Sequence, residues 1–314
     1  MSRLLFTFSP LPLLLWWLWT FISMPMSPNV AKLYEFPRGA WIENIAVRGN
    51  GNLVVVRFDQ PEVFEIEMDV SPPRSRLIAR FEEYKGIQGI AEIEPDIFAV
   101  MPFKGSTYSL WTVNLGSEGL KTEVISHIPD VGMLNGLTKL SPSTLLASDT
   151  KRGAIMRLDI ARKSSSTAIK DDSMAGLRFL GIGINGVRVR DSMVYYTNLW
   201  KGTLCKISVN PITATQIGTP QVVATNLGIL DDLAIDKDNQ QLYVMQYLAG
   251  TITRVQEDGT KEVVAKGLKY ITSAQFGRRE KDRNVLYVSS SGNPLGQAFK
   301  GAFEGGKVYA VHLE

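Results

Sequence analysis

The 314-residue sequence contains one cysteine and only two histidines. Cys205 alone cannot form an intrachain disulfide or a thiolate zinc site, and the short apolar stretch around it is typical of a buried strand. His127 and His312 are too few for a histidine-based triad or a multi-histidine metal site. Any catalysis must therefore use carboxylates, amides, hydroxyls or aromatic side chains.

The net charge of the chain is also small. The 34 Lys and Arg residues against 31 Asp and Glu residues leave +3, and no basic stripe with interleaved aromatics is present. This argues against a nucleic-acid partner. Apolar residues make up 45% and charged residues 21%, which is ordinary for a globular protein and excludes a disordered, collagen-like or coiled-coil chain.

Residues 1–27 differ from the rest of the chain. A short basic start, Met1-Ser2-Arg3, precedes an apolar centre at Leu11–Trp19. This pattern predicts a secretory signal peptide and a secreted or lumenal protein, with an uncleaved membrane anchor as the alternative. No later stretch approaches the length of a membrane span, so we expect membrane contact only through this leader. Residues 28–314 are expected to form a single domain.

An internal repeat organises these remaining residues. An apolar residue, a polar residue and a small or polar residue precede a short apolar strand, and a second apolar strand follows about ten residues later. The polar position recurs six times at a spacing of about 45 residues. Its six occupants are Glu43, Gln88, Asn135, Asn185, Asp231 and Thr272. Short strands at this period predict an all-β, six-bladed β-propeller.

The ring of blades also needs closure. Residues 31–36 read as a strand that precedes the first repeat, and Lys307–Val311 reads as another at the C-terminal end. We predict that the N-terminal strand completes the last blade, because sheet pairing at this point removes an exposed edge.

The innermost strand of each propeller blade lines the central channel, so the six polar residues are expected to point toward one axis. They need partners there, either water or a ligand. Two carboxylates together with amides form an oxygen ligand set that suits calcium or magnesium. Glu43, Asn185 and Asp231 are the expected ligands of one divalent cation. A water-filled channel without a ligand is the alternative.

These motifs resemble the senescence-marker-protein/gluconolactonase family of six-bladed propellers over residues 30–314. Glu43, Asn135-Gly136-Leu137, Asn185-Gly186-Val187 and Asp231 carry the resemblance. It implies that Glu43, Asn185 and Asp231 bind a divalent metal, that Asp231 also acts as a base, and that Asn135 touches the substrate.

Three positions depart from the family pattern. Glu43 is followed by Asn44-Ile45 where the family has Gly-Pro, and Asp232 stands where it has Gly. Met133 stands where an Arg commonly holds a polar sugar lactone. Replacement of a cation by methionine predicts a more lipophilic small-molecule substrate.

Residues that follow the second strands should lie around the mouth of the channel. Four of them are aromatic, namely Phe58, Phe103, Trp200 and Tyr247. Together with Met133 and Thr272 they are the predicted substrate-binding residues, because aromatic side chains can shape an apolar site. Packing between blades is the alternative role for each of these aromatics.

Three functions remain open at this point, as does the oligomeric state. The chain is similar to fungal propellers of natural-product pathways, some of which are hetero-Diels–Alderases. This resemblance implies a cyclase that holds a lipophilic polyketide or terpenoid intermediate, with donors such as Gln88, Asn135 or Thr272 on a carbonyl oxygen. The first alternative is a metal-dependent lactonase or esterase with Asp231 as the base. The second is a non-catalytic binding scaffold.

Overall fold

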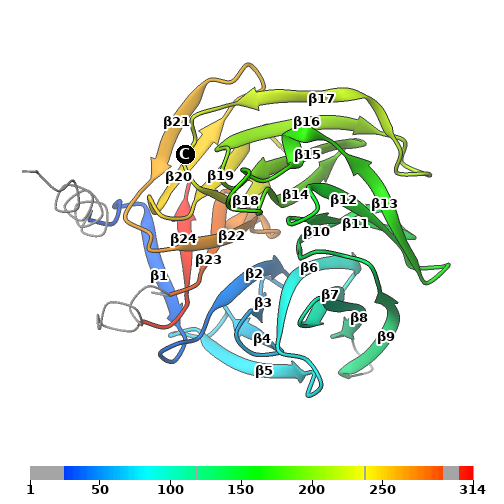
Figure 1. Cartoon of the computed structure of the whole chain (residues 1–314). Helices are drawn as coiled ribbons and strands as arrows, with labels where there is room; N and C mark the ends of the chain where they lie inside the picture. The colour runs from blue at the N-terminus through cyan, green and yellow to red at the C-terminus, as the bar shows by residue number, and fades with distance from the viewer. Residues whose placement is uncertain (1–24, 117–118, 237, 293–303, 314) are drawn as a thin grey trace, which may run out of the picture.

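A computed structural model describes residues 25–116, 119–236, 238–292 and 304–313. Its 24 strands form six four-stranded antiparallel sheets, arranged around a common axis (Figure 1). Within the described residues the only helical segments are two 3-10 turns, η1 (Asp172–Met174) and η2 (Glu280–Asp282). The predicted six-bladed β-propeller is confirmed.

Each blade runs from an inner strand near the axis to an outer strand at the periphery. The inner strands are β2 (Ile42–Val47), β6 (Gly86–Glu94), β10 (Leu134–Ser141), β14 (Ile184–Arg190), β18 (Leu230–Ile235) and β22 (Ile271–Phe276). The second strands are β3 (Leu53–Arg57), β7 (Ile97–Lys104), β11 (Thr144–Asp149), β15 (Met193–Asn198), β19 (Leu242–Gln246) and β23 (Val285–Ser290). The third strands are β4 (Glu62–Glu67), β8 (Thr107–Asn114), β12 (Ala154–Asp159), β16 (Thr203–Val209), β20 (Thr251–Val255) and β24 (Lys307–His312). The outer strands are β5 (Arg74–Arg80), β9 (Lys121–Ile128), β13 (Ser164–Lys170), β17 (Gln216–Ala224), β21 (Lys261–Ala265) and β1 (Val30–Glu35).

The first and last strands close the ring as the sequence predicts. The last blade has the order β1-β24-β23-β22, and β1 pairs antiparallel with β24 from Val30 opposite Val311 to Glu35 opposite Lys307. The N-terminal strand therefore ties the beginning of the propeller to its end and covers the edge of β24.

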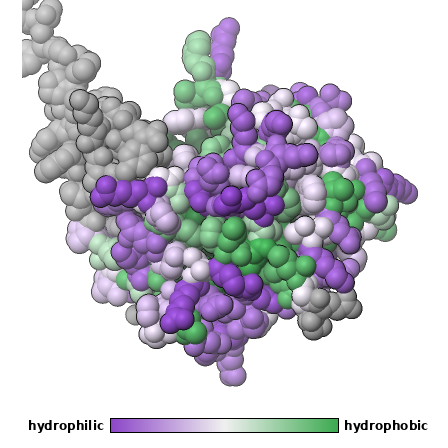
Figure 2. Space-filling view, turned by 90° about the horizontal axis from the view of Figure 1, so that it is seen from below, coloured by the Kyte–Doolittle hydropathy of each residue, from purple (hydrophilic) through white to green (hydrophobic). Residues whose placement is uncertain are grey.

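The hydrophobic core lies between neighbouring blades. Met101 of the second blade and Leu145 of the third belong to one buried cluster, and Met245 of the fifth and Leu286 of the sixth belong to another. Inner and second strands are buried on both faces and are rich in branched aliphatic residues for this reason. Outer strands are exposed, and a side view shows a mainly hydrophilic surface with some apolar residues near its centre (Figure 2).

A β-bulge interrupts each of the six inner strands at the repeated polar position. In the fourth blade Ile184 pairs with Asn198 and Val187 with Tyr196, so two inner residues oppose one residue of the second strand. The same shift occurs in the other five blades. A bulge changes the direction in which side chains leave the strand and increases its local twist. The repeat in the sequence is therefore the signature of a repeated bulge beside the axis.

The predicted leader falls largely on residues 1–24, which lie outside the described residues. From Pro25 onward the chain is held to the propeller, because the Ser27 N–H donates to the Lys266 carbonyl (3.1 Å) and the Asn29 amide donates to the carbonyls of Val264 (3.2 Å) and His312 (3.0 Å). Among the described residues, no helix has the length and apolar character that crossing a membrane requires.

Candidate functional site

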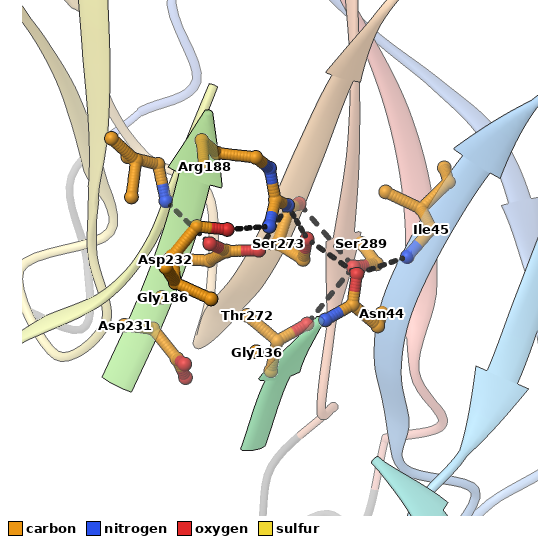
Figure 3. Close-up of polar contacts among 12 residues, drawn as sticks. Asn44, Ile45, Gly136, Gly186, Arg188, Asp231, Asp232, Thr272, Ser273 and Ser289 are labelled. Atoms are coloured by element: carbon orange, nitrogen blue, oxygen red, sulfur yellow. Dashed lines mark hydrogen bonds and ion pairs between the residues drawn. The ribbon is translucent and has the colours of Figure 1, made fainter. Parts of the chain in front are cut away.

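The six bulges build two rings of side chains around the axis. The mouth ring consists of the first bulge residues, Glu43, Gln88, Asn135, Asn185, Asp231 and Thr272. The deep ring consists of the residues that follow them, Asn44, Gly89, Gly136, Gly186, Asp232 and Ser273. All six mouth-ring residues are buried. The Asp231 carboxylate points away from the cluster around Asp232, so the two rings face different surroundings (Figure 3).

Glu43 is held in the mouth ring by two donors. The indole N–H of Trp41 donates to Glu43 Oε2 (2.5 Å), and the amide of Asn135 donates to Oε1 (3.1 Å). Burial raises the pKa of Glu43 to about 7, and the negative charge of Asp232 acts in the same direction, while the two hydrogen bonds oppose the rise. Trp41 and Asn135 therefore fix this carboxyl group in place across the first and third blades.

Asp231 and Asn185 form the second polar contact of this ring. Burial raises the pKa of Asp231, and the charges of Glu43 and Asp232 add to the rise, whereas a hydrogen bond from Asn185 lowers it. The side-chain oxygen of Asn185 is buried and has no hydrogen-bond partner among the described residues. A buried acceptor without a partner is costly, so this oxygen is available to a donor or a cation.

Gln88 presents a free donor in the same ring. Its side chain is 1% exposed, and the Tyr108 hydroxyl donates to its Oε1 (2.5 Å). The Gln88 amide nitrogen has no partner among the described residues. Because Tyr108 fixes the oxygen, the orientation of the amide is set, and its N–H groups are left for an acceptor that residues 25–116, 119–236, 238–292 and 304–313 do not provide.

Aromatic rings connect Glu43 to Gln88. Trp41 contacts Phe58 (5.1 Å between ring centroids), Phe58 contacts Phe103 (5.3 Å), and Phe103 contacts Tyr108 (5.7 Å). We call Trp41, Phe58, Phe103 and Tyr108 the aromatic arc. Its two ends donate hydrogen bonds to the two ring residues, and Phe58 and Phe103 are half-buried. The structure thus brings together two of the four aromatics that the sequence singles out.

The other predicted substrate-binding residues are placed separately. The Tyr247 hydroxyl hydrogen-bonds with Ser291 (3.1 Å), and its ring contacts Tyr270. Half-buried Trp200 has an indole N–H without a partner among the described residues. The backbone N–H of half-buried Met133 donates to Asp149 (3.0 Å). Thr272 donates to the Ile42 carbonyl (2.8 Å), so it joins the sixth blade to the first.

The deep ring contains a closed polar network. Arg188 forms an ion pair with Asp232, and the Ser273 hydroxyl lies within hydrogen-bonding distance of both Asp232 (2.6 Å) and the oxygen of Asn44 (3.0 Å) (Figure 3). The Asp232 carboxylate also accepts from the Leu233 N–H (2.8 Å). Burial raises the pKa of Asp232, while Arg188 and these donors oppose the rise. The network links blades four, five, six and one.

Glycine makes room for this network. A side-chain carbon at Gly186 would lie 2.2 Å from an Asp232 oxygen, so the carboxylate passes where another residue would carry its Cβ. Hydroxyls of second strands then join neighbouring bulges. Thr197 accepts from the Gly186 N–H (2.9 Å) and donates to the Asp231 carbonyl (2.5 Å). This contact fixes the backbone that carries Asp231.

The predicted metal ligands provide oxygen atoms in the mouth ring. Among the described residues no cluster of three or more His, Cys, Asp or Glu side chains could hold a metal, so a cation there requires the Asn185 amide as well. The unpartnered oxygen of Asn185 and the two carboxyl groups of Glu43 and Asp231 fit a hard divalent cation in their chemistry.

Sequence reasoning did not identify four of these residues as functional. Trp41 lies two residues before Glu43, on the loop that enters the same strand. Tyr108 comes from a third strand, and nothing in the repeat marks it. Arg188 and Asp232 had a signal, because two consecutive acids at one bulge require a cation, and the neighbouring inner strand carries two basic residues, Arg188 and Arg190.

Fold and site together define a six-bladed propeller with an acidic and amide-rich ring at its axis and an aromatic arc beside it. No family model matches the chain. Over 82% of its length it is 24% identical to a Phoma sp protein named "Putative hetero-Diels-Alderase", of which 86% is covered. It is 25% identical, again over 82% of its length, to the "Putative hetero-Diels-Alderase asR5" of Sarocladium schorii, of which 77% is covered.

Solved structures share the fold at lower sequence identity. A luciferin-regenerating enzyme superposes with a TM-score of 0.69 and 17% identity, over 92% of this chain and 95% of the other. Regucalcin from Agrobacterium tumefaciens, described as a calcium-binding protein, superposes with a TM-score of 0.66 and 14% identity, over 90% of this chain and 93% of the other. The resemblance inferred from the sequence motifs is thereby confirmed.

Proposed function

We propose that this protein is a biosynthetic cyclase that catalyses a hetero-Diels–Alder reaction between a lipophilic heterodiene and an alkene. The single observation that carries the proposal is the buried Gln88 amide, whose orientation is fixed by Tyr108 and whose N–H groups have no hydrogen-bond partner in the described part of the chain. The names of the two sequence relatives support the same reaction class.

The reaction needs no nucleophile or redox partner. The heterodiene, a conjugated C=C–C=O unit such as a quinone methide, forms one C–C bond and one C–O bond with the alkene. Three π bonds become one, and the carbonyl oxygen becomes the ring oxygen of a dihydropyran. A Gln88 N–H donated to that oxygen withdraws electron density from the heterodiene and stabilises the charge that develops there.

The second contribution to the rate acceleration is the positioning of the two reactants. Holding two reactants in contact with aligned orbitals replaces an encounter in solution by a reaction within one complex. Phe58 and Phe103 offer adjacent half-buried rings beside the mouth ring, suited to a flat conjugated substrate. We assign them, together with Met133, to binding the apolar parts of the two reactants.

The test is the rate and stereochemistry of dihydropyran formation from a quinone methide, generated in solution, and a sesquiterpene alkene. The full chain should accelerate adduct formation and favour one stereoisomer by chiral chromatography. Gln88→Leu should lower the rate by roughly tenfold to hundredfold, because it removes a donor to a carbonyl that gains only partial charge. Gln275→Leu, in the inner strand β22 beyond the bulge, is the matched control and should keep full activity. A racemic product at the uncatalysed rate would contradict the proposal.

A metal-dependent lactonase is the second candidate, favoured by the unpartnered oxygen of Asn185 beside Asp231. Glu43, Asn185 and Asp231 would hold a calcium or magnesium ion, which would supply polarisation of a lactone carbonyl. Asp231 would accept the proton of the attacking water.

The two candidates respond differently to chelation. Chelator treatment, or Asp231→Asn, should abolish lactone hydrolysis and leave cycloaddition largely intact, whereas Gln88→Leu should affect cycloaddition most. Turnover of neither substrate by the intact chain would favour the non-catalytic scaffold.

A further inference from the structure

The loops at one end of the propeller form a continuous rim. At this end the inner strands begin, and we call it the loop face. Backbone hydrogen bonds connect its loops one after another. The Gly183 N–H donates to the Thr150 carbonyl (2.9 Å), and the Gly183 carbonyl accepts from the Leu199 N–H (3.0 Å). The Leu199 carbonyl then accepts from the Leu230 N–H (3.2 Å). Bonds from Leu268 to Gly250 (3.0 Å) and from Ser27 to Lys266 (3.1 Å) extend the rim to the N-terminal segment. Residues far apart in the sequence therefore share one face.

The most exposed large apolar side chain of the described residues lies on this rim. Phe179 is 93% exposed, and Leu177 and Leu180 beside it are also exposed. They belong to a tight turn closed by hydrogen bonds from Leu180 and Gly181 to the Leu177 carbonyl. The tip of one turn therefore exposes three apolar side chains within four residues, and grouped exposed apolar side chains are typical of interaction sites.

A rigid base supports this tip. A side-chain carbon at Gly183 would lie 2.1 Å from the Met174 carbonyl, so the two arms of the loop pack at backbone contact. The Asn198 amide donates to the carbonyls of Ser173 (2.9 Å) and Ala175 (3.0 Å). The tip is therefore presented outward by a braced loop.

Two more exposed apolar residues stand on the same face. Leu248 lies in the turn between β19 and β20, and Met26 lies against the loop between β21 and β22. Gly267 allows this second contact, because a side chain there would collide with the Pro25 and Met26 backbone. Exposed apolar side chains thus lie on the loops of the fourth, fifth and sixth blades, so a flat surface could contact all three loops at once.

We propose that the loop face docks on the surface of a lipid bilayer that contains anionic phospholipids. Phe179, Leu248 and Met26 enter the interface. Exposed Arg178 precedes Phe179 in the tip, and exposed Lys266 accepts the backbone hydrogen bond of Ser27 beside Met26, so both cations would face the lipid head groups. The apolar sequence Leu11–Trp19 ends six residues before Pro25, whose backbone lies against Gly267 of the loop between β21 and β22, and this favours a bilayer over a protein partner as the occupant. The proposal does not depend on the reaction catalysed.

The experiment asks which face of the full chain touches the bilayer. Cys205 is buried, so an added surface cysteine can be labelled selectively with an environment-sensitive fluorophore. Leu248→Cys places the label on the loop face, and Ile212→Cys places it on the turn between β16 and β17 at the opposite end of a blade, where Ile212 is 77% exposed. Each protein is mixed with vesicles of phosphatidylcholine and phosphatidylserine that contain a nitroxide-labelled phospholipid as quencher.

The label at position 248 should shift to shorter wavelength and be quenched, and the label at position 212 should not. Adding Phe179→Ser to the Leu248→Cys protein should weaken vesicle binding by about tenfold or more, because burial of a phenyl ring is lost, whereas Ile212→Ser should change nothing. Equal quenching at both positions, quenching at neither, or no effect of Phe179→Ser would overturn the proposal. A spectral shift that depends on protein concentration without vesicles would also overturn it, since it would assign the face to a second copy of the chain.

Discussion

The mouth ring and the deep ring differ by one residue along each inner strand, yet they have opposite chemistry. In the deep ring Asp232, Ser273 and Asn44 satisfy one another together with Arg188, and glycines occupy the other three positions. In the mouth ring Gln88 and Asn185 each keep a buried polar atom that has no hydrogen-bond partner among the described residues. Burial raises the pKa of Asp232 as it raises those of Glu43 and Asp231, so the two rings differ in hydrogen-bond satisfaction and not in the direction of this shift. A saturated network stabilises a fold, whereas an unsaturated one is available to a ligand. We therefore propose that the deep ring stabilises the fold and that the mouth ring binds the ligand.

Substitution of the two adjacent aspartates, Asp231 and Asp232, should change the free energy of unfolding by very different amounts. Asp232→Ala leaves the Arg188 charge buried without its partner and should lower the free energy of unfolding by about 3–5 kcal/mol. Asp231 forms no ion pair with a described residue, so Asp231→Ala leaves no buried charge without a partner and should cost less than about 1 kcal/mol. Urea unfolding at neutral pH measures both. The double variant Asp232→Ala with Arg188→Met should recover most of the loss, and equal losses in the two single variants would refute the distinction between rings.

The pH dependence of stability tests the mouth ring. The pKa of Glu43 rises from 4.5 to about 7 on folding, so the folded protein binds an extra proton between these values. The protonated Glu43 side chain therefore stabilises the folded protein fully below pH 4.5, and this stabilisation is lost as the pH rises through about 7. The free energy of unfolding should fall by roughly 3 kcal/mol in total over this range because of Glu43. Glu43→Gln should reduce this slope when unfolding is followed in the presence of a chelator, and the part that remains arises from Asp231 and Asp232, whose pKa values burial also raises. A wild-type slope that Glu43→Gln leaves unchanged would assign the titration to another group.

Loss of the hydrogen bond from Tyr108 of the aromatic arc to Gln88 of the mouth ring should have a smaller effect on stability and rate. Tyr108→Phe removes the hydroxyl that orients Gln88 and should cost about 1 kcal/mol of stability. Cycloaddition should slow less than in Gln88→Leu, and stereoselectivity should fall, because the amide keeps its donor but loses its fixed orientation. Thermal unfolding and chiral product analysis measure the two effects. Unchanged selectivity would show that Tyr108 does not position Gln88.

Much of the fold follows from the sequence, because the period of about 45 residues with alternating turns and apolar strands is a property of each blade by itself. The closing strand could also be predicted, since an unpaired edge must be covered. Only part of the candidate site could be predicted from the sequence. The repeated polar position marks the mouth ring from Glu43 to Thr272, but the bulges that create two rings become visible only in the strand register. Tyr108 and Trp41 lie outside the repeated inner-strand motif, so the spacing of that motif does not reveal them.

A crystal structure of the protein with a dihydropyran product of the proposed reaction would show whether the mouth ring is the functional site. We expect the ring oxygen of the product to lie within hydrogen-bonding distance of the Gln88 amide nitrogen, with the conjugated part of the product against Phe58 and Phe103. A product bound at another place, with the Gln88 amide still unpartnered, would contradict the assignment of the mouth ring as the functional site.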